Sequence, residues 1–171
     1  MTTASGSREI PEPREQVWRA LAVLQPYCAV CDVSYVVDGG ADAGGGPGTR
    51  FACVPGRLDG GRLPATAPRG EIVEWQPSRV VTTRLELTPE VWTTRIELAD
   101  ADGGGTRVTV TLTHEPRGGN RLVRRVQRAA LQRLVQTTVD GELVKLPAHV
   151  AQLAAATGTA GPDLRQEPGQ P

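Results

Sequence analysis

The chain has 171 residues, of which 39% are hydrophobic and 22% are charged, and its 19 basic residues balance its 19 acidic residues. This length suits one domain with a sizeable buried core, and a net charge of zero argues against general binding to nucleic acid or to an anionic membrane. The three cysteines are an odd number, which is a poor basis for a disulfide framework and suits a reducing cytosol, so a cytoplasmic location is predicted.

The two ends of the chain least resemble folded structure. Residues 1–7 are small and polar, and residues 157–171 are rich in glycine and proline, so both segments are predicted to be disordered. The folded domain is then expected over residues 8–156. The start MTTASGSREI lacks a basic segment followed by an apolar run, and no segment approaches the ~18 apolar residues of a membrane span, so neither a signal peptide nor a span is predicted.

A short helix is predicted after the sequence PEP at residues 11–13, because proline fits the first turn of a helix. The apolar residues that follow share one helical face: Val17, Leu21 and Leu24. Pro26 should end this helix. Strands are then predicted over residues 33–40 and 49–54, with a glycine-rich loop between them and a second loop over residues 55–68.

Three later segments alternate apolar and polar residues, over residues 79–87, 91–98 and 106–114. A period of two along successive hairpins predicts an antiparallel sheet with one buried face. The residues expected to face inward are Val81, Thr83, Leu85, Leu87, Trp92, Thr94, Ile96, Leu98, Val108, Val110, Leu112 and His114. Arg84 and Arg95 should point outward, where Glu86 and Glu97 can pair with them.

A long helix is predicted to cover the sheet from about residue 118 to residue 155. It carries two apolar stripes at a helical period. The first stripe contains Leu122, Val123, Val126, Ala130 and Leu134. The second contains Leu131, Val135, Val139, Leu143, Leu146, Val150 and Leu153. The rotation between the stripes predicts either a bend near Asp140-Gly141 or two halves with different packing partners, and Pro147 is a second point where the helix could kink.

Five stretches, in this order, resemble the START-like superfamily, also called SRPBCC or the birch-pollen-allergen fold: PEPREQVWRAL, GPGTRF, RGEIVEWQPSRVVTT, GGGTRVTVTLTHEP and DGELVKLPAHV. Together they span most of residues 8–154. The resemblance implies an α+β helix-grip fold, in which a curved antiparallel sheet grips one long C-terminal helix and leaves a cavity. Pro147 and the segment PYCAVC depart from the family pattern. Its members include lipid carriers, polyketide cyclases and dehydratases, chaperone-activating domains and quinone-binding proteins, so the fold does not fix the function.

The favoured function is binding of a hydrophobic or amphipathic small molecule, such as a lipid, a polyketide or an aromatic metabolite, in the cavity between sheet and helix. Inward threonines leave room and supply hydroxyl groups, which suits a cavity better than a packed core. The predicted ligand-binding residues are Phe51, Thr83, Leu85, Trp92, Thr94, Val110, Leu112 and Leu134. No cofactor is predicted, and the oligomeric state is left open.

Two alternative functions remain. A polyketide cyclase or dehydratase could use His114 as a general base, because histidine titrates near neutral pH. His114 is a weak candidate, because the sequence identifies no second catalytic group. The simpler interpretation is a histidine at the rim of the sheet that makes one ordinary hydrogen bond. The third function is an interaction module that acts on a partner protein through its helix surface.

Cys28 and Cys31 have a C-x-x-C spacing, but no βαβ pattern surrounds them as in a thioredoxin-like redox protein. A zinc site would need two more ligands from Cys53, His114 and His149. We interpret the cysteines as buried or incidental, predict no metal, and expect His149 to be solvated. The basic stripe of the last helix contains Arg121, Arg124, Arg125 and Arg128. It is interpreted as the solvent-exposed polar face of an amphipathic helix, not as a nucleic-acid-binding site.

Overall fold

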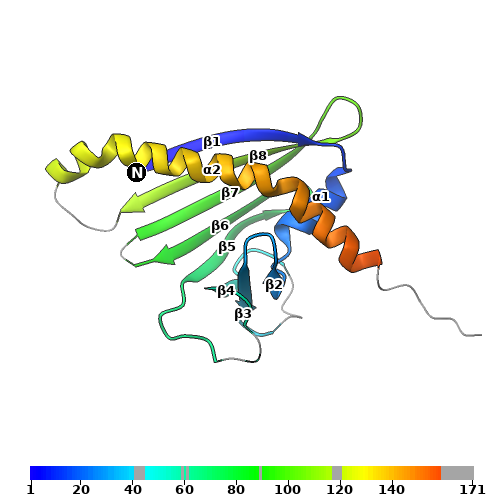
Figure 1. The fold of residues 1–171 in the computed structure, drawn as a ribbon, viewed down its shortest axis with the longest axis horizontal. Coiled ribbons are helices and arrows are strands. Elements are labelled where there is room, and N and C mark those ends of the chain that lie inside the picture. The colour runs from blue at the N-terminus through cyan, green and yellow to red at the C-terminus, as the bar shows by residue number, and fades with distance from the viewer. Residues whose placement is uncertain (41–44, 59, 61, 89, 117–120, 159–171) are drawn as a thin grey trace, which may run out of the picture.

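One antiparallel sheet and one long helix organise the chain (Figure 1). The computed structural model describes residues 1–40, 45–58, 60, 62–88, 90–116 and 121–158, with the side chains of residues 121–128 and 156–158 excepted. In chain order the elements are β1 (Thr2–Ile10), α1 (Arg14–Ala22), β2 (Tyr27–Cys28), β3 (Val33–Val37), β4 (Arg50–Pro55), β5 (Arg69–Gln76), β6 (Val80–Leu87), β7 (Glu90–Asp100), β8 (Thr106–Pro116) and α2 (Arg121–Gly158).

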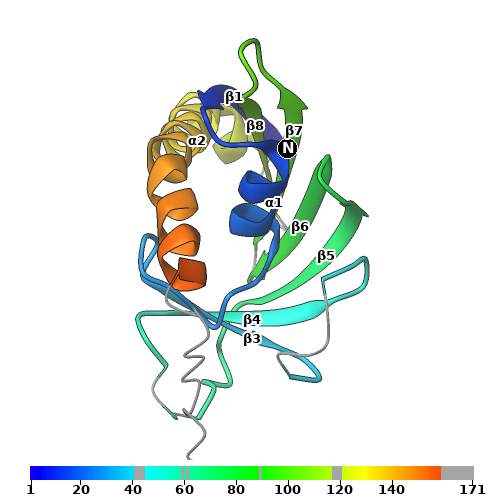
Figure 2. The same ribbon diagram turned by 90° about the vertical axis from the view of Figure 1, so that its right-hand side faces the viewer.

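The described strands form an eight-stranded sheet in the order β1-β8-β7-β6-β5-β4-β3-β2, and each neighbouring pair is antiparallel. Both helices lie on the same side of the sheet (Figure 2). The helix-grip fold is therefore confirmed. In the part of the chain that the structure describes, no helix combines the length and the apolar character needed to cross a membrane.

The second predicted stripe of the long helix is the face that packs on the sheet. Its buried members are Val135, Val139, Leu146 and Val150, and Leu143 and Leu153 pack against them. The sheet contributes Ile72, Val81, Leu98, Val108, Val110 and Leu112 to the same core cluster. The helix is continuous through Gly141 and Pro147.

The expectation that residues 1–7 are disordered is wrong, because residues 2–7 belong to strand β1. This strand pairs with β8 along its whole length, from Thr2 opposite His114 to Ile10 opposite Thr106. Serine and threonine hydroxyls form cross-strand pairs on the outer face: Thr3–Thr113, Ser5–Thr111 and Ser7–Thr109. The small inward residues that looked like a flexible terminus instead let α2 approach closely, and a Cβ at Gly6 would lie only 2.7 Å from Leu143 Cδ1. The predicted C-terminal tail lies, from residue 159 on, outside the described residues.

Arg8 compensates for the proline inside α2. In an uninterrupted helix the N–H of residue 147 would donate to the carbonyl of Leu143, and proline has no N–H. Arg8 Nη1 donates a hydrogen bond to that carbonyl at 3.0 Å and lies 3.4 Å from the carbonyl of Val144. Strand β1 thereby supplies the donor that Pro147 removes, which explains how this proline is tolerated within a continuous helix.

Replacing Arg8 by methionine is expected to lower the free energy of unfolding by about 1 kcal/mol, because the Leu143 carbonyl loses its charged donor and only water remains to replace it. Urea unfolding followed by circular dichroism measures the change. In a Pro147→Ala background the helix regains its own N–H donor, so the same Arg8 substitution should cost less, with a coupling of at least about 0.5 kcal/mol. Equal costs in the two backgrounds would contradict the link between Arg8 and Pro147.

Candidate ligand-binding site

The inner face of the sheet is covered by the helices only in part. α2 lies closest to β1 and β8, and α1 packs against α2 and β7. Inward side chains of β8, such as Val108 and Val110, are buried. Inward residues on β6 and β7 keep some of their surface accessible to solvent: Thr83, Leu85, Trp92, Thr94 and Ile96. We define these five residues as the open strip. It is a largely apolar surface on the helix side of the sheet, beyond the edge of α2.

The predicted ligand-binding residues divide between this strip and the core. Thr83, Leu85, Trp92 and Thr94 lie in the open strip, and Thr83 is directly opposite Thr94 in the β6–β7 register. Phe51, Val110 and Leu112 face the same side of the sheet, but they are buried in the core cluster. The structure therefore brings the predicted β6 and β7 residues together and places Phe51, Val110 and Leu112 among packed neighbours.

Leu134 does not belong with the buried residues. It is 53% exposed, whereas its neighbour Val135 is fully buried, so the first predicted helix stripe is wrong at this position. One residue rotates the helix surface by about 100°, and the packed face follows Val135 and Val139. The side chains of the first stripe before residue 129 lie outside the described residues.

Aromatic residues border the inner face on the β3–β5 side. Tyr35 and Phe51 make an edge-to-face contact with ring centroids 5.9 Å apart, and Trp18 of α1 packs against Trp75 at 4.9 Å. Burial raises the pKa of Tyr35, so its phenol stays protonated and can donate a hydrogen bond. This border gives the inner face flat apolar surfaces with a polar tip.

His114 marks the end of the open strip near Trp92. Its ring is 4.7 Å from the Trp92 ring between centroids, and its side chain is only 1% exposed. Its Nε2 lies 3.1 Å from Glu90 Oε2, a distance compatible with an ion pair if the ring is protonated. Within the described residues neither ring nitrogen has a hydrogen bond of acceptable geometry, so this buried polar group is short of a partner.

Glu90 is the functional candidate that sequence reasoning missed. It accepts a hydrogen bond from Trp92 Nε1 at 3.3 Å in addition to its contact with His114. The signal was present, because the period of two that places Trp92 inward places Glu90 on the same face. It directly follows Pro89 in the sequence and precedes the alternating run of residues 91–98, so the pattern alone did not include it.

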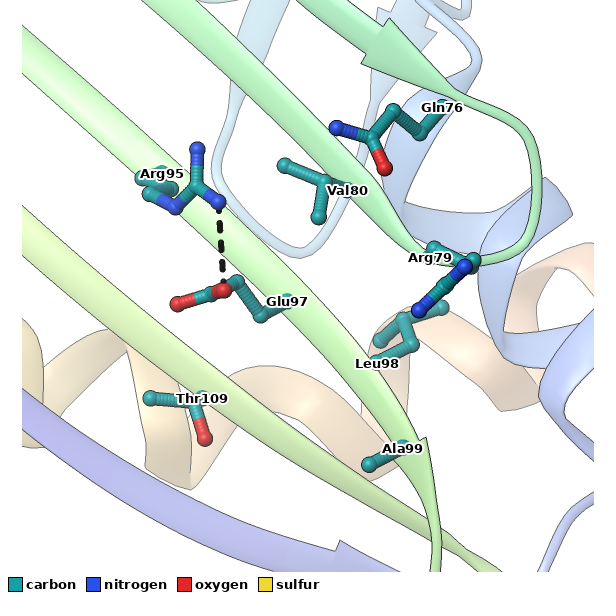
Figure 3. Close-up of a pocket in the computed structure, with 8 residues that line it drawn as sticks. All are labelled: Gln76, Arg79, Val80, Arg95, Glu97, Leu98, Ala99 and Thr109. Atoms are coloured by element: carbon teal, nitrogen blue, oxygen red, sulfur yellow. Dashed lines mark hydrogen bonds and ion pairs between the residues drawn. The ribbon is translucent and has the colours of Figure 1, made fainter.

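A hollow of about 440 Å³ lies on the opposite face of the sheet (Figure 3). Its lining residues are Gln76, Arg79, Val80, Arg95, Glu97, Leu98, Ala99 and Thr109. Arg95 pairs with Glu97 at 3.2 Å and also with Glu74, and Arg84 pairs with Glu86 at 3.5 Å. The outward placement of the two arginines is thus confirmed. This polar outer hollow is not the predicted cavity beside α2.

The C-x-x-C cysteines lie next to a histidine of α2. Cys28 Sγ is 3.5 Å from His149 Nδ1, and Cys31 Sγ is 3.5 Å from His149 Nε2. The expectation that His149 is solvated is therefore wrong, and burial lowers the pKa of this histidine, which favours a neutral ring near pH 7. Cys53 is also half-buried, but it is not part of this group.

A family model described as polyketide cyclase / dehydrase and lipid transport matches residues 1–151. Among solved structures, the protein TTHA0849 of Thermus thermophilus is 27% identical, with a TM-score of 0.56 over 90% of this chain and 99% of that one. Ara h 8.0201 is 17% identical with a TM-score of 0.54, over 88% of this chain and 97% of that chain. Norcoclaurine synthase of Thalictrum flavum is 10% identical with a TM-score of 0.55, over 90% and 86% of the two chains. No curated protein matches the chain.

Proposed function

The chain belongs to the polyketide cyclase / dehydrase and lipid transport family, and on that premise we propose that it binds a hydrophobic or amphipathic small molecule against the open strip. This proposal rests mainly on the partial exposure of the open-strip residues, which lie on the same side of the sheet as α2 without being covered by it. Leu85, Trp92 and Ile96 offer apolar contact. Binding sites for such ligands combine apolar walls with a few polar groups that fix orientation.

Polar groups that could fix the orientation of a ligand lie in and beside the open strip. The hydroxyls of Thr83 and Thr94 belong to it directly, and the buried imidazole of His114 is short of a hydrogen-bond partner at its end. A ligand with a hydroxyl, carbonyl or carboxyl group could satisfy His114 while its apolar part covers Leu85 and Trp92. A lipid, a polyketide or an aromatic metabolite has this combination of groups.

Replacing Thr94 by phenylalanine is expected to weaken ligand binding by at least about tenfold, which corresponds to about 1.4 kcal/mol. The larger side chain would cover the part of the open strip that the ligand needs, while the strand itself tolerates an aromatic residue. The measurement is a fluorescence titration with 8-anilinonaphthalene-1-sulfonate, followed by displacement of the probe with oleate or with a compound that co-purifies with the native protein.

Thr93→Phe is the matched control, because Thr93 precedes Thr94 on the same strand, has similar exposure and points to the outer face. It should leave the affinity for the probe unchanged. If both variants weaken binding equally, or if neither does, the probe does not bind at the open strip and the assignment of the site is wrong.

A second function, a cyclase-type or dehydratase-type enzyme, is favoured by one observation. His114 and Glu90 place an imidazole and a carboxylate 3.1 Å apart beside the strip, which is a pairing suited to general acid–base catalysis. Native mass spectrometry of protein from its own host would identify a bound compound. Conversion of that compound by the wild-type protein, but not by His114→Gln or Glu90→Gln variants that still bind it, would favour the enzyme over the carrier.

A further inference from the structure

Two segments far apart in the chain bring three metal-binding side chains together. Cys28 ends strand β2, Cys31 lies in the turn between β2 and β3 that follows α1, and His149 comes from α2. One ligand atom from each of the three residues can be chosen so that all three atoms lie within 4.8 Å of one another. The open strip and its ligand play no part in this cluster, so it raises a separate question.

The spacing of the cluster matches a tetrahedral zinc ion. Zn–S bonds of about 2.3 Å and Zn–N bonds of about 2.0–2.1 Å at a tetrahedral angle place sulfur and nitrogen about 3.6 Å apart. Cys28 and Cys31 each have Sγ at 3.5 Å from an imidazole nitrogen of His149. The two sulfurs face different ring nitrogens, so binding one ion by both cysteines requires the ring to turn until a single nitrogen points at that ion.

The turn that carries the cysteines is already held in shape. The N–H of Cys31 donates to Cys28 Sγ at 3.4 Å. Asp32 has a left-handed backbone with φ of 52°, its carbonyl accepts a hydrogen bond from the N–H of Gly56 at 2.7 Å, and its carboxylate accepts one from the Tyr27 hydroxyl at 2.8 Å. The cysteines therefore need little rearrangement to bind an ion.

The chemistry of the group favours metal binding over thiol redox chemistry. A redox C-x-x-C pair of the thioredoxin type lies next to a βαβ unit, whereas Cys28 and Cys31 lie in the antiparallel β2–β3 hairpin. Two thiolates and one imidazole are ligands that suit Zn²⁺. Within the part of the chain that the structure describes, the group has three members, which leaves the fourth tetrahedral position to water or to another small ligand.

We propose that Cys28, Cys31 and His149 bind one Zn²⁺ ion and thereby fasten the turn after α1 to the long helix. The ion would displace the protons of the two thiols and take the lone pair of one imidazole nitrogen, so the protein ligands and the ion together carry no net charge. Because a ligand that binds only the folded state stabilises it, zinc should also raise the temperature of unfolding.

The test uses the full-length protein, reduced and freed of metal. Zn²⁺ is titrated in competition with a chromophoric chelator, and Co²⁺ is added separately to report geometry and ligand type. The expected results are one Zn²⁺ per chain, a higher temperature of unfolding with zinc, and a Co²⁺ spectrum with the intense visible bands of a tetrahedral site and a thiolate charge-transfer band. Absence of stoichiometric binding by the wild-type protein would overturn the proposal.

The variants assign the ligands. Cys31→Ser and His149→Gln should each weaken zinc binding by more than about 100-fold, since changes outside the ligand shell alone cost 10–100-fold. Cys53→Ser is the matched control and should bind as the wild type does. If Cys28→Ser fails to fold, His149→Gln still tests whether the three residues bind the ion, because it leaves the turn with the cysteines unchanged. The proposal would also be overturned if Cys53→Ser lost as much zinc affinity as the ligand variants. The same holds if protein kept under reducing conditions contained a Cys28–Cys31 disulfide in place of the metal.

Discussion

Replacing Ile72 by alanine is expected to lower the free energy of unfolding by about 2–5 kcal/mol. Ile72 is completely buried and belongs to the core cluster between the sheet and the helices. It also adjoins a β-bulge in β5. Its N–H donates to the carbonyl of Thr49 at 2.9 Å, and its own carbonyl accepts from Gly48 at 2.7 Å. Because both the N–H and the carbonyl of Ile72 are held by residues 48 and 49, the strand is not free to move inward and fill the space left by the side chain.

Urea unfolding at equilibrium measures the loss, and Val73→Ala provides the control. Val73 is the next residue on the same strand and is 46% exposed, so its truncation should change stability by less than about 0.5 kcal/mol. A loss below about 1 kcal/mol for Ile72→Ala would contradict the expectation, because it would mean that the core is loosely packed around this residue.

Replacing Gly70 by valine is expected to lower the free energy of unfolding by about 3 kcal/mol. Gly70 lies opposite Phe51 in the β4–β5 register, and the aromatic ring covers it. A Cβ at this position would be 2.4 Å from Phe51 Cζ and 2.7 Å from Cε2. The ring is buried, with 4% of its residue surface exposed, so it has no open space into which it can move.

A double mutant tests this cause directly. In a Phe51→Leu background the clash is relieved, so Gly70→Val should cost less there than in the wild type, a coupling that thermal or urea unfolding can measure. Gly46→Val is the control, because a Cβ at Gly46 meets nothing within 4 Å. Additive losses for Gly70→Val and Phe51→Leu would show that the ring is not the reason for glycine at this position.

The architecture was predictable because alternation and helical periodicity are written into long stretches of the chain. The inward set on β8 and the residues Val135, Val139, Leu146 and Val150 of the second stripe of α2 are buried as the patterns indicated. Strand β1 was missed because its inward residues, such as Ala4 and Gly6, are small. Small residues weaken a hydrophobic pattern, and here they are required by the close approach of α2.

The sites were less predictable because they depend on contacts between distant segments. Glu90 meets His114 across the β7–β8 pairing, and His149 meets Cys28 across about 120 positions of sequence. Periodicity can assign a residue to a face of a strand or a helix, but it cannot say which turn will lie against that face. Leu134 illustrates the same limit, since one residue along α2 separates an exposed side chain from the buried Val135.

The pairing of β1 with β8 has a consequence for how the chain is made. Thr2 finds its partner only when His114 has been synthesised, so the first strand leaves the ribosome long before the edge that it will join. Closing so long a loop is entropically costly and slows the folding of sheets built from distant strands. During that interval the backbone N–H and C=O groups of β1 that will pair with β8 have no strand partner. Docking of the N-terminal strand is therefore the step at which association between neighbouring nascent chains competes with folding.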